Sequence, residues 1–523
     1  MTSSSLKSLA LSFYTLLSRI LGLVRDHYMA TSFGNGMVAS AFSVAYRFPN
    51  MFRNLLAEGT LSQSFMPIFS DYEKIGREDA RQMTGVVLSF LFFFLSCIVA
   101  VFWVLAGKFL PDLVGGSNEY GKLVVDLSLI LFFLIATASL SSIFMSISNS
   151  KHNYFVPSLS PIILNLSYLS VFLFAFPIVQ NIEKRVYILA YGIVGGGVLQ
   201  LLVQAWYVGR LGLFPILRLD LNHPALKKIF SLMLPAALGG SFYQLGLLVD
   251  IFLANYVQNQ DPNIRAVVSL DYAQRLVQLP TGIIGVAIAT TILPTLLETK
   301  KMGKKEEIPN EIASALTFGL FLTIPASFGL IILGDSVLNA IYLGGRWTLE
   351  STAQAVLPLA LYSLAIPFYS CNKILISSYY AFQDTKTPLR MQLIAFVMNL
   401  VLAICFLGIL RHSSIALASA IGSAITTILL IYHLKSHDVR FALDAFGKRI
   451  LFLLFPLLGL GIWLFLIGLW RDPARDAWTE RGYLLLGIGP GIGIYFFLAY
   501  FLKLPEFMGL WNRIQSKIRK RNP

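Results

Sequence analysis

Residues 86–108 read VVLSFLFFFLSCIVAVFWVLAGK, and the first 22 of these residues carry no charge. A helix of about 20 apolar residues is long enough to cross the hydrocarbon core of a bilayer. The stretch does not alternate between apolar and polar residues, and it is longer than the roughly 10-residue strand of a membrane barrel. It therefore predicts a membrane-spanning helix.

Apolar stretches of this kind recur along the whole chain. Of the 523 residues, 56% are hydrophobic and 13% are charged, whereas soluble domains average about 25% charged residues. Fourteen segments are predicted to span the membrane: residues 8–33, 37–60, 86–108, 123–148, 157–177, 187–209, 229–257, 266–297, 312–334, 351–380, 388–409, 413–435, 449–470 and 482–502. The loops between them, at most about 25 residues long, are too short for a soluble catalytic domain. We therefore predict an all-α polytopic membrane protein that is not an enzyme.

The basic residues are distributed unevenly between the predicted loops. The net charge is +14, with 41 Lys and Arg against 27 Asp and Glu. When basic residues at the ends of the spans are counted with the adjoining loops, the N-terminus, the even-numbered loops and the C-terminal tail hold 25 of the 41, the odd-numbered loops hold 10, and the interiors of the spans hold 6. Cytoplasmic loops carry the excess of Lys and Arg in membrane proteins. We therefore expect both termini in the cytoplasm, and we interpret the charge as a topology signal and not as a nucleic-acid site.

A weak internal repeat indicates two similar halves. SFY occurs at 12–14 and again at 241–243. Pro157 opens the fifth predicted span, which contains Asn165, and Pro388 opens the eleventh, which contains Asn399. Repeats of this kind are typical of transporters whose two lobes surround a central cavity. We expect an N-lobe of six spans over residues 1–222, a C-lobe of six spans over 223–440, and two additional spans with a basic tail over 441–523.

Charged residues inside the predicted spans point to the site. Each costs at least about 2.5–3.5 kcal/mol at mid-bilayer, so such residues usually mark a pathway. The first two spans contain Arg19, Arg25, Asp26, Arg47, Arg53 and Glu58, and the eighth contains Asp271 and Arg275. On ideal helices, Arg19 and Asp26 share one face, and Arg47, Glu58 and Asn50 share another.

The arginines outnumber the carboxylates that could neutralise them. Pairing Asp26, Glu58 and Asp271 with arginines leaves at least two cations, although a purely structural role for these charges remains an alternative. Arginine stays charged and binds phosphate oxygens through a planar fork. We therefore predict a hydrated cavity for a polyanion. The predicted substrate-binding residues are Arg19, Arg25, Arg53, Arg275, Glu58, Asp26, Arg47 and Asn50.

Four motifs resemble the MurJ family of bacterial lipid II flippases. They are SRILGLVRD at 18–26, RFPNMFRNLLAEGTLSQSFMP at 47–67, YAQRLVQLPTGIIGVA at 272–287 and DTKTP at 384–388. The family residues needed for function correspond to Arg19, Arg25, Arg53, Glu58 and Arg275. Ser40, Gln274 and Gln278 stand where some members have acidic residues, which puts an acidic role at these positions in doubt.

The resemblance implies a fold, a substrate and a location. The fold is that of the multidrug/oligosaccharidyl-lipid/polysaccharide exporter (MOP) superfamily, with the last two helices lining a groove for a lipid tail. The activity is movement of undecaprenyl-diphosphate-linked disaccharide-pentapeptide, the peptidoglycan precursor lipid II, across the bacterial cytoplasmic (inner) membrane. The partners expected are lipid II, membrane lipids and other cell-wall synthesis proteins.

We expect alternating access without covalent chemistry and without a cofactor. The membrane potential is one candidate driving force, and sodium bound by Asp250 and Asn399 is another. Two alternatives share the fold: a flippase for a different polyprenyl-diphosphate oligosaccharide, and a drug or organic-cation antiporter. The surplus of arginines opposes the antiporter. A membrane glycosyltransferase is a third alternative, opposed by the short outer loops and the lack of an acidic metal-binding motif.

Overall fold

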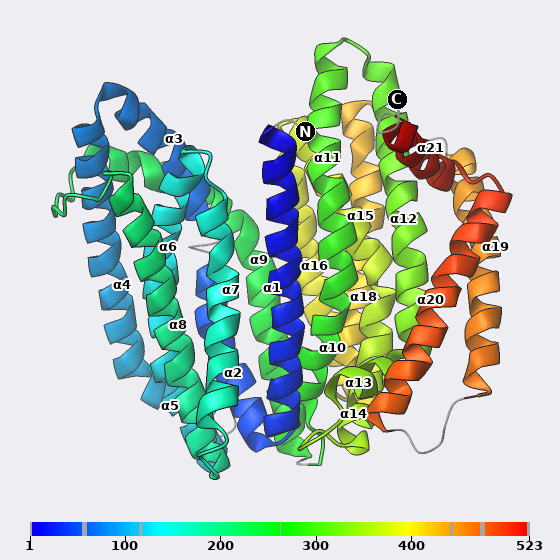
Figure 1. The fold of residues 1–523 in the computed structure, drawn as a ribbon, viewed down its shortest axis with the longest axis horizontal. Helices are drawn as coiled ribbons and strands as arrows, with labels where there is room; N and C mark the ends of the chain where they lie inside the picture. The colour runs from blue at the N-terminus through cyan, green and yellow to red at the C-terminus, as the bar shows by residue number, and fades with distance from the viewer. Residues whose placement is uncertain are drawn as a thin grey trace. The chain divides into compact units, whose positions relative to one another are not determined.

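In a computed structural model of the chain, nearly all residues lie in helices (Figure 1). The structure describes residues 3–54, 60–114, 118–261, 263–439, 443–470 and 476–519. Within these ranges the only β feature is an isolated bridge between Gly344 and Trp347. Helices satisfy their backbone hydrogen bonds internally, as a segment surrounded by lipid must. The predicted all-α class is therefore confirmed.

The chain divides into two units, Met1–Val268 and Ser269–Pro523. The helices of the first unit are α1 (Ser3–Phe33), α2 (Met37–Phe52), α3 (Thr60–Ile75), α4 (Arg77–Val114), α5 (Glu119–Leu131), α6 (Phe133–Ser150), α7 (Phe155–Ser170) with the π-helix η2 (Val171–Ala175), α8 (Ile182–Arg210) and α9 (Pro224–Gln260). Starting just before the boundary, α10 (Ala266–Pro280) leads into the second unit.

The second unit continues from α10 through the π-helix η3 (Thr281–Gly285) into α11 (Val286–Lys301). Its other helices are η4 (Lys305–Glu307), α12 (Ile308–Ile332), α13 (Gly334–Tyr342), α14 (Leu349–Leu364), α15 (Ile366–Ala381), α16 (Lys386–Cys405), α17 (Leu407–Leu410), α18 (Ser413–His433), η5 (Leu434–His437), α19 (Leu443–Gly468), α20 (Ala477–Phe501) and α21 (Pro505–Arg519).

Eleven helical segments within the described residues are long and apolar enough to cross a membrane. They coincide with the third to sixth and the eighth to fourteenth predicted spans. The other three predicted spans correspond to α1, α2 and α9, which are not among the eleven. The number fourteen therefore stays a prediction, whereas a protein with many membrane spans is confirmed.

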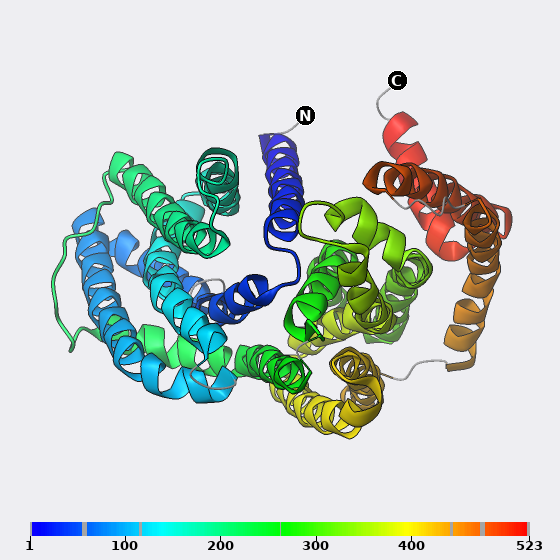
Figure 2. The same cartoon turned by 90° about the horizontal axis from the view of Figure 1, so that it is seen from below.

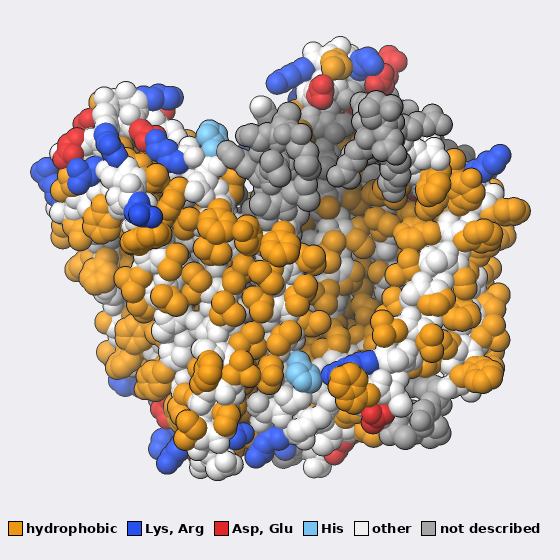
Figure 3. All heavy atoms as spheres, in the orientation of Figure 1, with side chains coloured by type: hydrophobic (Ala, Val, Ile, Leu, Met, Phe, Trp, Pro, Cys, Tyr) orange, Lys and Arg blue, Asp and Glu red, His pale blue; other side chains and the backbone are white. Residues whose placement is uncertain are grey.

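The surface fits a lipid environment. Hydrophobic side chains cover the middle of the helices, while Lys, Arg, Asp and Glu gather toward the helix ends (Figure 3). Large side chains such as Phe174, Trp206 and Phe465 are 74%, 59% and 69% exposed. A soluble protein rarely exposes apolar surface this extensive. Lipid chains would cover it here.

The last two long helices, α19 and α20, lie side by side at one edge of the second unit (Figure 2). Leu460 and Leu464 of α19 are buried in one cluster with Leu333, which follows α12. The pair is thereby attached to the helices that precede it. Helices α19 and α20 correspond to the two additional spans that the sequence predicts after the second set of six.

Helix α9 packs within the first unit, against α3 and α4. Three amide side chains near its C-terminal end contribute hydrogen bonds: those of Asn255 and Gln258, and that of Asn259, which donates to the Val114 carbonyl at 3.0 Å. Asn255 accepts one from the Tyr120 hydroxyl at 2.6 Å and donates one to the Val114 carbonyl at 2.7 Å. Gln258 accepts one from Ser40 at 3.2 Å. The contact boundary at 268/269 therefore differs from the lobe boundary that we predict at 222/223, and the predicted lobes stay a prediction.

Two loops of the chain are built in the same way. The Asn153 carbonyl oxygen accepts hydrogen bonds from two amides at the start of α7, and its amide group donates to Tyr207 of α8. One oxygen of Asp384 accepts from two amides at the start of α16, at 3.0 and 2.9 Å, and the other accepts from His437 at 3.0 Å. Each loop thus caps one helix and ties it to the end of the next long helix. The DTKTP motif begins with this cap.

The loop between α8 and α9 lies directly on α4. Arg81 donates a hydrogen bond to the Phe214 carbonyl at 2.9 Å, and its own carbonyl accepts one from the Ile216 amide at 3.2 Å. A Cβ atom on Gly85 would lie 1.7 Å from the Ile216 carbonyl oxygen. The loop can approach α4 only because residue 85 has no side chain.

We predict that Gly85→Ala destabilises the fold by about 1–3 kcal/mol, because the added methyl group forces the loop backbone away from α4. Gly107→Ala is the matched control on the same helix, where a Cβ meets no atom within 4 Å. That control should be neutral or stabilising by up to about 1 kcal/mol. Chemical unfolding of both variants in detergent checks this, and equal effects would contradict the close approach.

The Asp384 cap predicts a pH dependence of stability. Burial favours the neutral acid, but the hydrogen bonds from Thr387 and His437 outweigh it and lower the pKa of Asp384 from 3.8 to about 2. A lowered pKa means that the folded protein favours the ionised form. The contribution of the Asp384 carboxylate to the free energy of unfolding is therefore complete above about pH 4 and is lost as the pH falls toward 2.

Asp384→Asn should lower the free energy of unfolding by about 2 kcal/mol at pH 5, because hydrogen bonds to a charged group are lost. The difference from the wild type should shrink below pH 4. Asp220→Asn is the control, since Asp220 caps only a surface turn through the Asn222 amide. A difference that stays constant from pH 5 to pH 3 would show that the ionised cap does not stabilise the fold.

Candidate functional site

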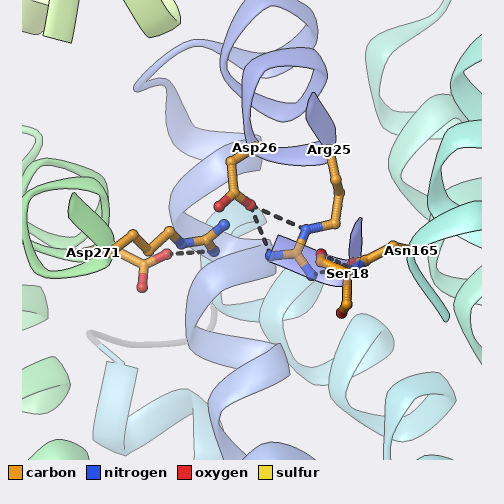
Figure 4. Close-up of polar contacts among 6 residues, drawn as sticks. Ser18, Arg25, Asp26, Asn165 and Asp271 are labelled. Carbon is orange, nitrogen blue, oxygen red and sulfur yellow. Dashed lines mark hydrogen bonds and ion pairs between the residues drawn. The ribbon is translucent and has the colours of Figure 1, made fainter. Parts of the chain in front are cut away.

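Arg25 on α1 is a cation of the predicted site that contacts several neighbouring side chains (Figure 4). Its Nε and Nη2 atoms donate to one oxygen of Asp26 at 3.0 and 2.9 Å, and Nη1 donates to Asn165 of α7 at 3.0 Å. The guanidinium also lies over the Tyr168 ring, 5.2 Å from its centroid. The side chain is nonetheless 23% exposed, against 10% for Asp26. Arg25 is thus oriented from several sides but still accessible.

Asn165 also fixes the backbone of α1. Its Nδ2 atom donates to the Ser18 carbonyl at 3.1 Å, and a Cβ on Gly22 would come within 3.9 Å of the same nitrogen. Ser18, Gly22 and Arg25 therefore meet α7 along one side of α1. This contact gives a structural reason for the spacing of the SRILGLVRD motif.

Arg19 lies one turn before Gly22 and borders an open hollow of about 420 Å³. The hollow is lined by Tyr14, Thr15, Ser18, Arg19, Asn149, Tyr154, Pro157, Ser158 and Pro161. These residues belong to α1, the end of α6 and the start of α7. The sequence places Arg19 and Asp26 on one face of α1, and in the structure Asp26 forms an ion pair with its neighbour Arg25.

The second group of predicted residues lies at the end of α2. Asn50 and Arg53 line a small cavity of about 20 Å³ between α2, α6, α7 and α8, which has room for one water molecule. The helix changes to π-type hydrogen bonding at Arg53 and Asn54. Such π segments are frequent at functional sites. Glu58 lies outside the described residues.

Arg47 sits further toward the start of α2, within electrostatic range of Asp250 on α9. The predicted sodium site combines Asp250 with Asn399, which is on α16 in the other unit. Asn399 donates to Ser419 at 3.1 Å, and its buried carbonyl oxygen accepts no hydrogen bond from the described residues. A free oxygen suits a cation, but the proximity of Arg47 to Asp250 opposes one. The sodium site therefore stays a prediction.

In the second unit, Arg275 of α10 donates to Asp271, one turn earlier, at 2.9 Å (Figure 4). The Arg275 side chain is 24% exposed, and its guanidinium lies 5.2 Å from the centroid of the Tyr272 ring. Thr281 begins the π-helix η3 that follows α10, and its carbonyl accepts a hydrogen bond from the Lys373 ammonium group at 3.3 Å.

Sequence reasoning alone did not identify the two tyrosines beneath the arginines. Tyr272 lies three residues before Arg275, a spacing that brings side chains together on a helix, so this contact could have been inferred. Tyr168 meets Arg25 from another helix, and no local pattern reveals it.

The sequence profile described as "Lipid II flippase MurJ" matches residues 29–473. The chain belongs to the MurJ family. A probable lipid II flippase of Rhizobium tropici is 31% identical over 503 residues, which cover 93% of this chain and 92% of the relative. One of Vibrio cholerae is 31% identical over 517 residues, covering 94% and 95%.

Solved structures agree with this family membership. A structure titled "Lipid II flippase MurJ, inward closed conformation" matches with a TM-score of 0.75 and 25% identity, covering 95% of this chain and 99% of that one. An inward-facing multidrug transporter of the MOP superfamily matches with a TM-score of 0.69 at 12% identity, over 84% and 99%. The second likeness concerns the fold alone. The exporter fold that the motifs imply is therefore confirmed.

We predict that Asn165→Ala loosens α1 from α7. The change removes the hydrogen bonds to Arg25 and Ser18, and we expect a loss of about 2 kcal/mol in the free energy of unfolding. Ser167→Ala is the control, because the Ser167 hydroxyl bonds to the Ile163 carbonyl of its own helix. If the two variants unfold at the same denaturant concentration, Asn165 does not hold the two helices together.

Proposed function

We propose that this protein is a lipid II flippase. It moves undecaprenyl-diphosphate-linked disaccharide-pentapeptide from the inner to the outer leaflet of the bacterial cytoplasmic membrane. It works as a transporter, by alternating access and without covalent chemistry. Membership of the MurJ family supports this proposal, as do curated relatives that match over nearly their whole length.

The observation that carries the proposal is that the Arg25 guanidinium is held by its neighbours and is still accessible. A guanidinium inside a membrane protein is costly unless paired or hydrated. Asp26, Asn165 and Tyr168 orient this one while leaving it accessible. A fixed planar fork is suited to bind the oxygens of a diphosphate. In the second unit, Asp271 and Tyr272 orient Arg275 in the same way and also leave it accessible.

We assign the other parts of the lipid by their chemistry. The apolar tail stays in the bilayer next to α19 and α20, whose exposed faces are hydrophobic. An inside-negative potential of 100 mV is worth about 2.3 kcal/mol per elementary charge and favours outward movement of the anionic headgroup. Both termini lie in the cytoplasm, in keeping with the excess of basic residues in the tail and the even-numbered loops.

The proposal predicts that Arg19→Ala, Arg25→Ala, Arg53→Ala and Arg275→Ala each fail to support growth of cells depleted of their own lipid II flippase. Lysine at the same positions should fail at one or more of them, since a point charge lacks the bidentate fork. The control is Arg210→Ala, because Arg210 lies exposed at the end of α8 over Trp206. Immunoblots of membrane fractions should show equal amounts of every variant.

The lipid-linked precursor that accumulates in the depleted cells identifies the substrate. Accumulation of the disaccharide-pentapeptide precursor, relieved by the wild-type protein, supports the proposal. Relief of a different polyprenyl-diphosphate oligosaccharide would favour the alternative flippase. Growth with all four alanine variants would refute the diphosphate site.

A further inference from the structure

The Arg275 guanidinium lies over a buried aromatic cluster. The Tyr272 ring beneath it is 3% exposed. Tyr342 meets this ring edge-on, with centroids 4.7 Å apart, and Trp347 lies 4.9 Å away at an angle of 49°. Tyr342 and Trp347 are themselves 0% and 1% exposed and contact each other. A ring enclosed on two sides cannot move unless its neighbours move.

A tight turn brings Trp347 back onto α13. Gly344 and Gly345 adopt φ angles of 133° and 55°, which residues with a side chain rarely adopt. The Gly344 amide donates to the Trp347 carbonyl at 3.1 Å, and the Trp347 amide donates to the Gly344 carbonyl at 3.0 Å. The turn thus fixes the backbone on which the indole stands.

A chain of buried hydrogen bonds connects this indole to α20. Trp347 Nε1 donates to the Thr352 hydroxyl at 3.0 Å, and that hydroxyl donates to the Asn339 carbonyl oxygen at 2.7 Å. The amide group of Asn339 donates to Glu480 at 3.4 Å. Asn339 is 0% exposed, Glu480 2% and Thr352 3%. The next residue of α20, Arg481, donates to the Ala340 carbonyl of α13 at 2.9 Å.

Packing alone does not account for these residue types. A buried amide, hydroxyl and carboxylate each cost free energy unless they are hydrogen-bonded. Apolar side chains of similar volume would attach α20 to α13 without that cost. What a connected polar network adds is one defined arrangement of its members. Here the network ends at Trp347, which contacts the Tyr272 ring beneath Arg275.

We propose that Trp347, Thr352, Asn339 and Glu480 are positioning residues for Arg275. Through these hydrogen bonds the position of α20 determines that of Trp347. Trp347 in turn holds the Tyr272 ring beneath the Arg275 guanidinium. This inference rests on the proposed function, in which Arg275 binds the diphosphate and α20 adjoins the lipid tail. Under it, one connected set of side chains responds to both ends of the same lipid.

The test removes the central hydroxyl while keeping the volume of the side chain. Thr352→Val removes both hydrogen bonds of the Thr352 hydroxyl, and Thr352→Ser restores them. Thr323→Val is the matched control in the same unit, because Thr323 is likewise buried, at 0% exposed, but its hydroxyl bonds to the Gly319 carbonyl of its own helix. Trp347→Phe is a second variant, which keeps a ring but removes the indole donor.

The first measurement needs no substrate. Fluorotyrosine is placed at position 272 of the full-length protein in nanodiscs, and its fluorine resonance is recorded. The resonance should shift in Thr352→Val and in Trp347→Phe, return in Thr352→Ser, and stay unchanged in Thr323→Val. An unchanged resonance in both Thr352→Val and Trp347→Phe would overturn the inference whatever the substrate is.

The second measurement is the binding of the lipid-linked diphosphate disaccharide-pentapeptide. Thr352→Val should weaken it about tenfold, within the range of coupling through side-chain networks. In an Arg275→Ala background the same change should have no further effect, because the two act on one contact. Full additivity of the two changes would overturn the inference. A shifted resonance with normal binding in both Thr352→Val and Arg275→Ala would support the positioning but refute the proposed role of Arg275.

Discussion

A guanidinium inside a bilayer has to be solvated by the protein itself. The hydrocarbon offers no hydrogen bonds, and the ion keeps its charge at every physiological pH. The contacts around Arg25 and Arg275 follow from this constraint. Each is bonded to an aspartate close by on its own helix and lies over an aromatic ring, which attracts a cation electrostatically. The helices that contribute these groups are therefore held at fixed positions around the arginines.

The same constraint explains the polar residues between the helices. Asn165 is 6% exposed, yet both ends of its amide are bonded, one to Arg25 and the other to the backbone of α1. A leucine could fill this volume but could not orient a cation. Near Arg53 and beside Lys373 the backbone adopts π-type hydrogen bonding, and at Thr281 the carbonyl accepts from the lysine. Side chains and backbone thus replace water where the charges lie.

Helix α9 has contacts distant in the chain that the internal repeat of the sequence does not record. The internal repeat makes it the first helix of the second half. Its amides at Asn255 and Gln258 nevertheless bond to α2, α4 and α5 of the first half. In an apolar surrounding, several bonded amides are hard to detach, because each would be left without a partner. We therefore expect α9 to move with the first unit when the transporter changes state.

The sequence by itself determined the helical class, the approximate helix bounds and the residues that carry the charge. Residues 187–209, for example, are predicted as a span, and α8 extends from Ile182 to Arg210. This succeeds because a long apolar segment in lipid has few structural solutions. Only the tertiary structure decided that Asp26 pairs with Arg25, that Tyr168 lies beneath this arginine, and that Asn339 bonds to Glu480, 141 positions away. The last two contacts join segments far apart in the chain, and neither hydropathy nor helical periodicity records which segments meet.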